Sequence, residues 1–436
     1  SNDSWREHPE DAERQDHKGF QQIIMVNEDT LSYIIQHRTD DPRKLALQSR
    51  PSCVDMAYAL EQIAGWQAAR QKLPRWASTE GVVFPPHLSM EQCSSELTAS
   101  YKSGVADRLL GGGAGDKEHS LVDLTGGFGV DFSYLARCFK RATYVERQQR
   151  LCELASHNMP LLGLPEAEIV CADGTEYLQS LDHVSMIFVD PARRDDNGGK
   201  TFAISDCTPD VAALADMLVE KADYVFIKLS PMLDWHKAVA DMRYVSEVHV
   251  VAVRNECKEL LLVLRKGKDD ESSSQVRLFC VDSIQKDDGG VEFATDCFDV
   301  ESGHGGLQSS SFANPMEGMY LYEPNASLMK AGCFAELSLR FGVSQVSRNS
   351  HLFLSDAPLE GFHGRCFWIR QVSSMNKKEL RKSLAGITKA NIAVRNFPLS
   401  VAELRKRMKL KDGGSDYIFA TTLQDDSHVL LLCEKA

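Results

Sequence analysis

The sequence LVDLTGGFGVDF, residues 121–132, joins an apolar segment to a turn rich in glycine. The apolar segment reads as a β-strand that ends at Asp123, and Gly126, Gly127 and Gly129 follow it. Because glycine has no Cβ, the backbone can turn sharply at these positions and approach a ligand closely. The segment therefore predicts a strand, a tight turn and a helix, with a nucleoside cofactor bound over the turn.

Two other nucleotide-binding motifs fit this segment poorly. A dinucleotide fingerprint G-x-G-x-x-G that starts at Gly127 would put Phe132 where its third glycine belongs, and the G-K-S/T of a P-loop is absent. The pattern D-x-x-G-G-x-G after a strand instead resembles class I S-adenosylmethionine-dependent methyltransferases. This resemblance implies an α/β, Rossmann-like fold with S-adenosyl-L-methionine as cofactor. It assigns these residues to the cofactor site: Asp123, Thr125, Gly126, Gly127 and Gly129.

Acidic residues stand at the ends of the next three predicted strands. These strands end at Glu146, at Asp173 beside Gly174, and at Asp190. Open α/β sheets bind ligands at the carboxyl ends of their strands, so the acids are expected to meet at one edge. The resemblance implies that Glu146 contacts the ribose hydroxyls and that Asp173, with Gly174, contacts the adenine. The alternative is that each acid only caps a helix at the surface.

Length and composition indicate a soluble, multidomain protein. The 436 residues are 43% hydrophobic and 25% charged, which fits about three globular domains. No secretory leader or apolar run long enough to span a bilayer is visible, and twelve cysteines show no metal-binding or disulfide pattern. We therefore expect a cytoplasmic protein with reduced thiols, no bound metal and no membrane partner.

Charge is distributed unevenly along the chain. From residue 363 to the end there are 14 Lys and Arg against 7 Asp and Glu, although the formal net charge of the whole chain is −13. A basic tail on an acidic body predicts contact with a polyanion, while a solvated helix face is the alternative. The residues predicted to bind RNA are Lys377, Lys378, Arg381, Arg395, Arg405, Lys406, Arg407 and Lys409.

Periodicity divides the chain into four predicted segments. Residues 1–78 show helical spacing, and residues 79–267 alternate strands with helices. A small α+β domain of ferredoxin-like pattern is predicted at 268–360, and a second compact α+β unit at 361–436. The helix just before the first sheet strand is expected to bring Lys102 to the cofactor edge.

Nearly everything after residue 50 resembles a family of bacterial class I methyltransferases with a ferredoxin-like insert and a C-terminal THUMP-like domain. THUMP domains accompany RNA modification, so the resemblance implies an RNA substrate such as tRNA or rRNA. The segments that carry it are QKLPRW (71–76), QCSSELTASYK (92–102), LTGGFGVDF (124–132), DPARRD (190–195), IKLSPMLDW (227–235), NECKELLLV (255–263) and ANIAVRNFPLSVAELRKR (390–407).

The fourth strand end predicts the methyl-transfer site. In amino-methylating relatives this position reads D/N-P-P-Y/F, where the acid and the proline carbonyl hold the target amine and the aromatic ring stacks on the base. Here Asp190 and Pro191 match, the aromatic residue is missing, and Arg193 is expected to contact base or phosphate. The preferred prediction is N-methylation of a base, with Asp190, Pro191 and Arg193 as the catalytic residues.

Three alternatives stay open. DPAR also resembles uracil C5 methyltransferases, which need a nucleophilic cysteine, and only Cys207 or Cys257 could supply one. The chain could instead methylate a small molecule or a protein. It could also be an RNA-binding protein without catalysis, although its intact acids argue against this. The sequence leaves the RNA species, the methylated atom and the oligomeric state open.

Overall fold

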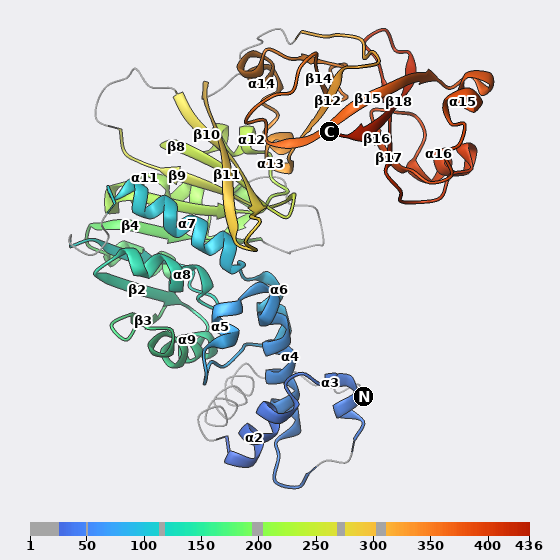
Figure 1. The fold of residues 1–436 in the computed structure, drawn as a ribbon. Helices are drawn as coiled ribbons and strands as arrows, with labels where there is room; N and C mark the ends of the chain where they lie inside the picture. The colour runs from blue at the N-terminus through green and yellow to red at the C-terminus, as the bar shows by residue number, and fades with distance from the viewer. Residues whose placement is uncertain (1–25, 49–50, 113–117, 194–203, 268–274, 302–310) are drawn as a thin grey trace, which may run out of the picture. The chain divides into compact units, whose positions relative to one another are not determined.

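The structure is a computed structural model that describes residues 26–48, 51–112, 118–193, 204–267, 275–301 and 311–436 (Figure 1). The chain divides into two compact units. One comprises Ser1–Ser246 and Leu261–Asp270, and the other comprises Glu247–Leu260 and Glu271–Ala436. Among the described residues, no helix is both long enough and apolar enough to cross a membrane.

The described part of the first unit begins with six helices, and polar side chains cap the starts of several of them. Asn27, Asp55 and Ser95 each accept a hydrogen bond from a backbone amide of the first turn, which satisfies a donor that has no partner within the helix. The helices are α2 (Glu28–His37), α3 (Pro42–Ala46), α4 (Met56–Lys72), α5 (Pro74–Ser78), α6 (His87–Gln92) and α7 (Glu96–Leu109).

A parallel sheet follows, with its strands in the order β7-β4-β1-β2-β3. The strands are β1 (Ser120–Asp123), β2 (Arg141–Glu146), β3 (Glu168–Cys171), β4 (Val184–Val189) and β7 (Ala222–Leu229). The connecting helices are α8 (Val130–Leu135), η1 (Ala136–Cys138), α9 (Gln149–Leu161), α10 (Gly174–Ser180) and α11 (Val211–Lys221). Alternating parallel strands and helices form the Rossmann-like α/β fold that the sequence predicts, with the carboxyl ends of the strands along one edge.

Among the described residues, the whole sheet has nine strands, in the order β11-β10-β8-β9-β7-β4-β1-β2-β3. The further strands are β8 (Val245–Val253), β9 (Glu256–Leu264), β10 (Gln275–Gln285) and β11 (Val291–Glu301). The sequence predicts a separate small domain at residues 268–360, but β10 pairs with β8 and with β11. Period-2 apolar spacing marks a strand without naming its neighbour, which explains the difference.

A seven-stranded sheet forms the rest of the second unit, in the order β13-β14-β12-β15-β18-β17-β16. Its strands are β12 (Tyr320–Pro324), β13 (Ser344–Gln345), β14 (Phe353–Ser355), β15 (Gly364–Ser374), β16 (Asn391–Arg395), β17 (Asp416–Thr422) and β18 (His428–Lys435). Its helices are α13 (Ala326–Ala331), α14 (Phe334–Phe341), α15 (Lys377–Ser383) and α16 (Val401–Met408). Strands from both sides of residue 360 pair directly, because β12 is antiparallel to β15.

Short elements complete the described chain. A two-stranded pair, β5 (Ala192–Arg193) with β6 (Cys207–Thr208), follows the end of β4, and η2 (Ile204–Asp206) and α12 (Trp235–Asp241) lie nearby in sequence.

Candidate active site

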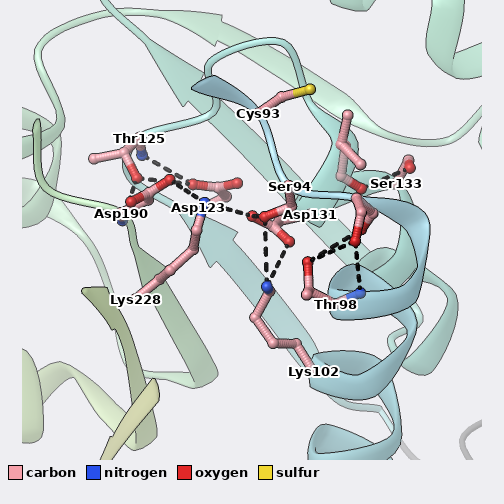
Figure 2. Close-up of polar contacts among 12 residues, drawn as sticks. Cys93, Ser94, Thr98, Lys102, Asp123, Thr125, Asp131, Ser133, Asp190 and Lys228 are labelled. Atoms are coloured by element: carbon pink, nitrogen blue, oxygen red, sulfur yellow. Dashed lines mark hydrogen bonds and ion pairs between the residues drawn. The ribbon is translucent and has the colours of Figure 1, made fainter. Parts of the chain in front are cut away.

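The turn after β1 is tied to the turn after β4 through Thr125. The backbone amide of Thr125 donates to Oδ1 of Asp123 at 2.9 Å, and the amide of Asp190 donates to Oγ1 of Thr125 at 2.7 Å. Asp123 is buried at the end of β1, whereas the Asp190 side chain is 38% exposed. Thr125 thus fixes the position of Asp190 relative to the glycine turn (Figure 2).

The glycines of this turn are required by close packing and by backbone conformation. A Cβ on Gly126 would lie 2.2 Å from ring atom Cε2 of Tyr144, and a Cβ on Gly129 would lie 2.5 Å from Cε of Met159. Gly127 has φ +55 and Gly129 has φ +89, a region that other residues rarely adopt. A Cβ on Gly127 would make an ordinary contact with the carbonyl oxygen of Thr125 at 3.7 Å, so packing does not exclude a side chain there.

Glu146 binds the turn from the neighbouring strand. Its Oε2 accepts from the amide of Gly127 at 3.0 Å, and its Oε1 accepts from the amide of Gln148 at 2.9 Å. The side chain is buried and caps no helix. The surface-cap alternative therefore does not describe Glu146, nor the buried Asp123.

Asp173 differs from the other acids because it is an exposed helix cap. Its Oδ1 accepts from the amides of Thr175 at 2.8 Å and Glu176 at 3.2 Å, at the start of α10. Among the described residues, its Oδ2 accepts no hydrogen bond and is available to a ligand. The next residue, Gly174, packs so closely that a Cβ would lie 2.2 Å from the carbonyl oxygen of Leu124.

Two lysines and two aspartates form a row of alternating charge behind the strand ends. Nζ of Lys102 lies 3.1 Å from Oδ1 of Asp131, and Nζ of Lys228 lies 3.4 Å from Oδ2 of the same residue. Nζ of Lys228 also lies 2.6 Å from Oδ2 of Asp190. Ser94 donates from Oγ to Oδ2 of Asp131 at 2.7 Å. Figure 2 shows these contacts, which run in space from Lys102 through Asp131 and Lys228 to Asp190.

The pKa values of the two buried aspartates are shifted in opposite directions. Burial raises the pKa of Asp123 well above its usual range, and the carboxylates of Asp131, Asp190 and Glu146 add to the effect. Burial would also raise the pKa of Asp131, but the charges of Lys102 and Lys228 outweigh it and lower that pKa. Asp131 is therefore held as an anion.

The sequence reasoning assigned Lys102 to the cofactor and did not single out Asp131. Lys102 is fully buried, and its Nζ contacts Asp131 and, at 3.5 Å, Oγ of Ser94. Lys228 lies near a strand end, where a lysine side chain is more often solvated. Its side chain is only 12% exposed. An aspartate inside the apolar run VDF, and a lysine inside YVFIKL, were the available signals.

The tip after β4 is described in part. Pro191 is buried, and the backbone of Arg193 pairs with that of Cys207 in β5 and β6. The side chain of Arg193 lies outside the described part of the structure. Among the described residues, no group of three or more His, Cys, Asp or Glu could hold a metal ion.

The predicted RNA-binding residues fall into two groups. Six are exposed on α15 and on or just after α16: Lys377, Lys378, Arg381, Lys406, Arg407 and Lys409. Arg395 instead forms an ion pair with the buried Glu323. Arg405 donates to the carbonyl oxygen of Ala390 at 3.1 Å and to Oδ1 of Asp412 at 2.7 Å. These two arginines are engaged within the fold.

A crystal structure of a candidate methyltransferase from Porphyromonas gingivalis W83 matches this architecture over almost the whole chain. The two proteins are 32% identical, the match covers 94% of this chain and 99% of the other, and the TM-score is 0.81. The chain belongs to this methyltransferase family. Within the methyltransferase, residues 320–362 match a family model for a ferredoxin-like domain, and residues 364–435 match one described as THUMP domain-like.

Other solved structures share less with this methyltransferase. A SAM-dependent methyltransferase from Agrobacterium tumefaciens is 15% identical, with 47% of this chain and 60% of that chain covered and a TM-score of 0.29. An rRNA methylase from Streptococcus thermophilus is 15% identical, with 41% and 99% covered and a TM-score of 0.29. At these TM-scores the two matches carry no argument about this chain. A search of curated proteins finds no match.

Proposed function

We propose that this methyltransferase transfers the methyl group of S-adenosyl-L-methionine to a base nitrogen in structured RNA, such as tRNA or rRNA. The observation that carries the proposal is the joining of two turns. The glycine turn after β1 and the Asp190 turn after β4 are hydrogen-bonded through Thr125. Cofactor and acceptor would therefore meet at one strand edge.

The turn after β1 fits a nucleoside cofactor. A Cβ on Gly127 would make no close contact with the described residues, Glu146 ends β2, and Asp173 follows the end of β3. Glu146 would reach the ribose hydroxyls, and Oδ2 of Asp173 would accept from the adenine amino group. When bound, S-adenosyl-L-methionine supplies an activated methyl group on a sulfonium.

Asp190 would orient the acceptor. Methyl transfer is an in-line displacement, so the protein has to align an electron-rich atom with the methyl group and exclude water. Among the described residues, Oδ1 of Asp190 accepts no hydrogen bond, while Oδ2 is held by Lys228. Oδ1 could therefore accept from an exocyclic amine, with the carbonyl of Pro191 beside it and Arg193 contacting base or phosphate.

The basic residues of α15 and α16 support an RNA substrate. Lys377, Lys378, Lys406 and Arg407 are exposed in a segment that matches the THUMP-like family model. Lysine and arginine contacts to phosphates supply most of the non-specific affinity for nucleic acids. Because Arg395 and Arg405 are engaged internally, fewer cations face solvent than the sequence count suggests, and this favours a small-molecule or protein acceptor as the second candidate.

Two measurements test the proposal. Mass spectrometry of nucleosides from total RNA, with and without the protein, should reveal one methylated nucleoside that depends on the protein. With tritiated S-adenosylmethionine, Asp190→Ala should abolish transfer to RNA while circular dichroism and cofactor binding persist. Undiminished transfer by Asp190→Ala, or methylation of a metabolite with no dependence on salt, would contradict the proposal.

A further inference from the structure

We propose that Lys228 is a positioning residue that holds one oxygen of Asp190 so that the other faces the methyl acceptor. This inference rests on the proposed function, because Asp190 is placed there at the site of methyl transfer. It assigns to the reaction a buried cation that contacts neither of the two reactants.

The strand register brings Lys228 to Asp190. Strands β4 and β7 are parallel neighbours, and their pairing places Val189 opposite Ile227. Lys228 is the next residue of β7, and Asp190 is the first residue after β4. Nζ of Lys228 donates a short, charge-assisted hydrogen bond to Oδ2 of Asp190 at 2.6 Å.

Asp131 restrains the lysine from behind. Its Oδ2 lies 3.4 Å from Nζ of Lys228, and its other contacts, Lys102 and Ser94, come from the buried side. If Lys228 turned away, the buried Asp131 would lose one of its two counter-charges, which is costly, and Asp190 would lose its ion pair. Lys228 is therefore held between two anions.

The exposure of the row points in one direction. Lys102 is fully buried, the side chain of Asp131 is 9% exposed and that of Lys228 is 12% exposed, whereas that of Asp190 is 38% exposed. Only the final carboxylate of the row is open enough to meet a substrate. A carboxylate whose Oδ2 is fixed by an ion pair presents Oδ1 in a defined direction.

Such fixation matters for an in-line displacement. A displacement of about 1 Å at the reacting centre can cost a factor of about 100 in rate. Lys228 would act on the rate through Asp190 and would have no effect on cofactor affinity. Its role is separable from that of the residues around the glycine turn.

Three variants of the full-length chain test the role. Lys228→Met should lower kcat for RNA methylation about 10- to 100-fold, with little change in KM or in the calorimetric affinity for S-adenosylmethionine. Lys228→Arg keeps the charge and should restore most of the rate. Lys237→Met is the matched control, since Lys237 lies on α12 in an exposed pair with Asp241, and its rate should not change.

The possible results are decisive. An unchanged kcat in folded Lys228→Met overturns the proposal, and so does an equal loss of stability and cofactor affinity that Lys228→Arg fails to rescue. If the wild type transfers no methyl group to RNA, the proposed function fails. In that case a crystal structure of Lys228→Met decides the positioning role, because Asp190 should turn to a different rotamer, and an unchanged rotamer overturns it.

Discussion

The ring of Tyr144 on β2 packs directly against Gly126 in the turn after β1. A Cβ on Gly126 would lie 2.2 to 2.5 Å from three atoms of the tyrosine ring, and the Tyr144 hydroxyl donates a hydrogen bond to the carbonyl oxygen of Gly127. The buried ring thus limits the turn by packing, and the hydroxyl fixes it by a hydrogen bond. The conformation of the turn depends on a residue of the neighbouring strand.

This relationship predicts the effect of Gly126→Ala. The buried ring has little room to move, so the added methyl group should lower the free energy of unfolding by about 1–3 kcal/mol. Urea unfolding measures the change. Gly104→Ala is the matched control, because a Cβ there meets nothing within 4 Å in the exposed face of α7, and it should stabilise the protein by about 0.5–1 kcal/mol. An unchanged free energy of unfolding for Gly126→Ala would contradict the packing argument.

Asp131→Asn should be strongly destabilising. It removes the anion that faces both Lys102 and Lys228, and the removal of one member of a buried ion pair costs about 3–5 kcal/mol. Chemical denaturation should show this loss. The double variant Lys102→Met with Asp131→Asn should recover part of it, because the uncompensated charge is then gone. Additive losses in the double variant would show that the two side chains do not interact.

The raised pKa of Asp123 predicts that Asp123→Asn stabilises the fold by an amount that depends on pH. Burial, followed by neighbouring carboxylates, raises this pKa well above its ordinary 3.8. Ionised Asp123 therefore lowers the free energy of unfolding at every pH above the raised pKa, and the penalty disappears as pH falls to the ordinary value. Asp123→Asn, which keeps an acceptor for the Thr125 amide, should raise the stability at neutral pH and give no gain near pH 3.8. Equal gains at both pH values would contradict this.

Charge reversal on α16 should weaken RNA binding. Replacing Lys406 and Arg407 by Glu removes two exposed cations, and the slope of log affinity against log salt should fall by about 0.7 for each lost phosphate contact. Filter binding across a salt series measures the slope. Lys286→Glu is the control, since Lys286 is an exposed lysine far from α16 in sequence that pairs with Glu292. An unchanged slope for the double variant would remove α16 from the RNA surface.

The sequence predicted those parts of the fold and site that depend on local pattern. The apolar segment before Asp123 and the glycines after it encode structure within a few residues, and the structure contains both features. Glu146 could be placed because a strand end is readable from hydropathy.

Contacts between distant elements could not be read in the same way. Asp131 meets Lys228 across 97 positions of sequence, and Glu323 pairs with Arg395 across 72. The charge of the tail predicts that Arg395 is a surface residue. Composition does not reveal that its partner, Glu323, is buried. Asp173 and Glu146 both stand at predicted strand ends, but only Glu146 is buried, because burial depends on tertiary packing that spacing does not specify.

The pairing of β12 with β15 limits how the chain can be divided. A fragment that starts after residue 360 would leave β15 without its neighbour on one side, and the exposed backbone donors and acceptors would invite pairing with another molecule. Glu323, on the removed strand, would also leave Arg365 and Arg395 without their shared carboxylate. The two segments that family models treat as separate modules are therefore expected to aggregate when they are expressed apart and to remain monodisperse as residues 311–436 together.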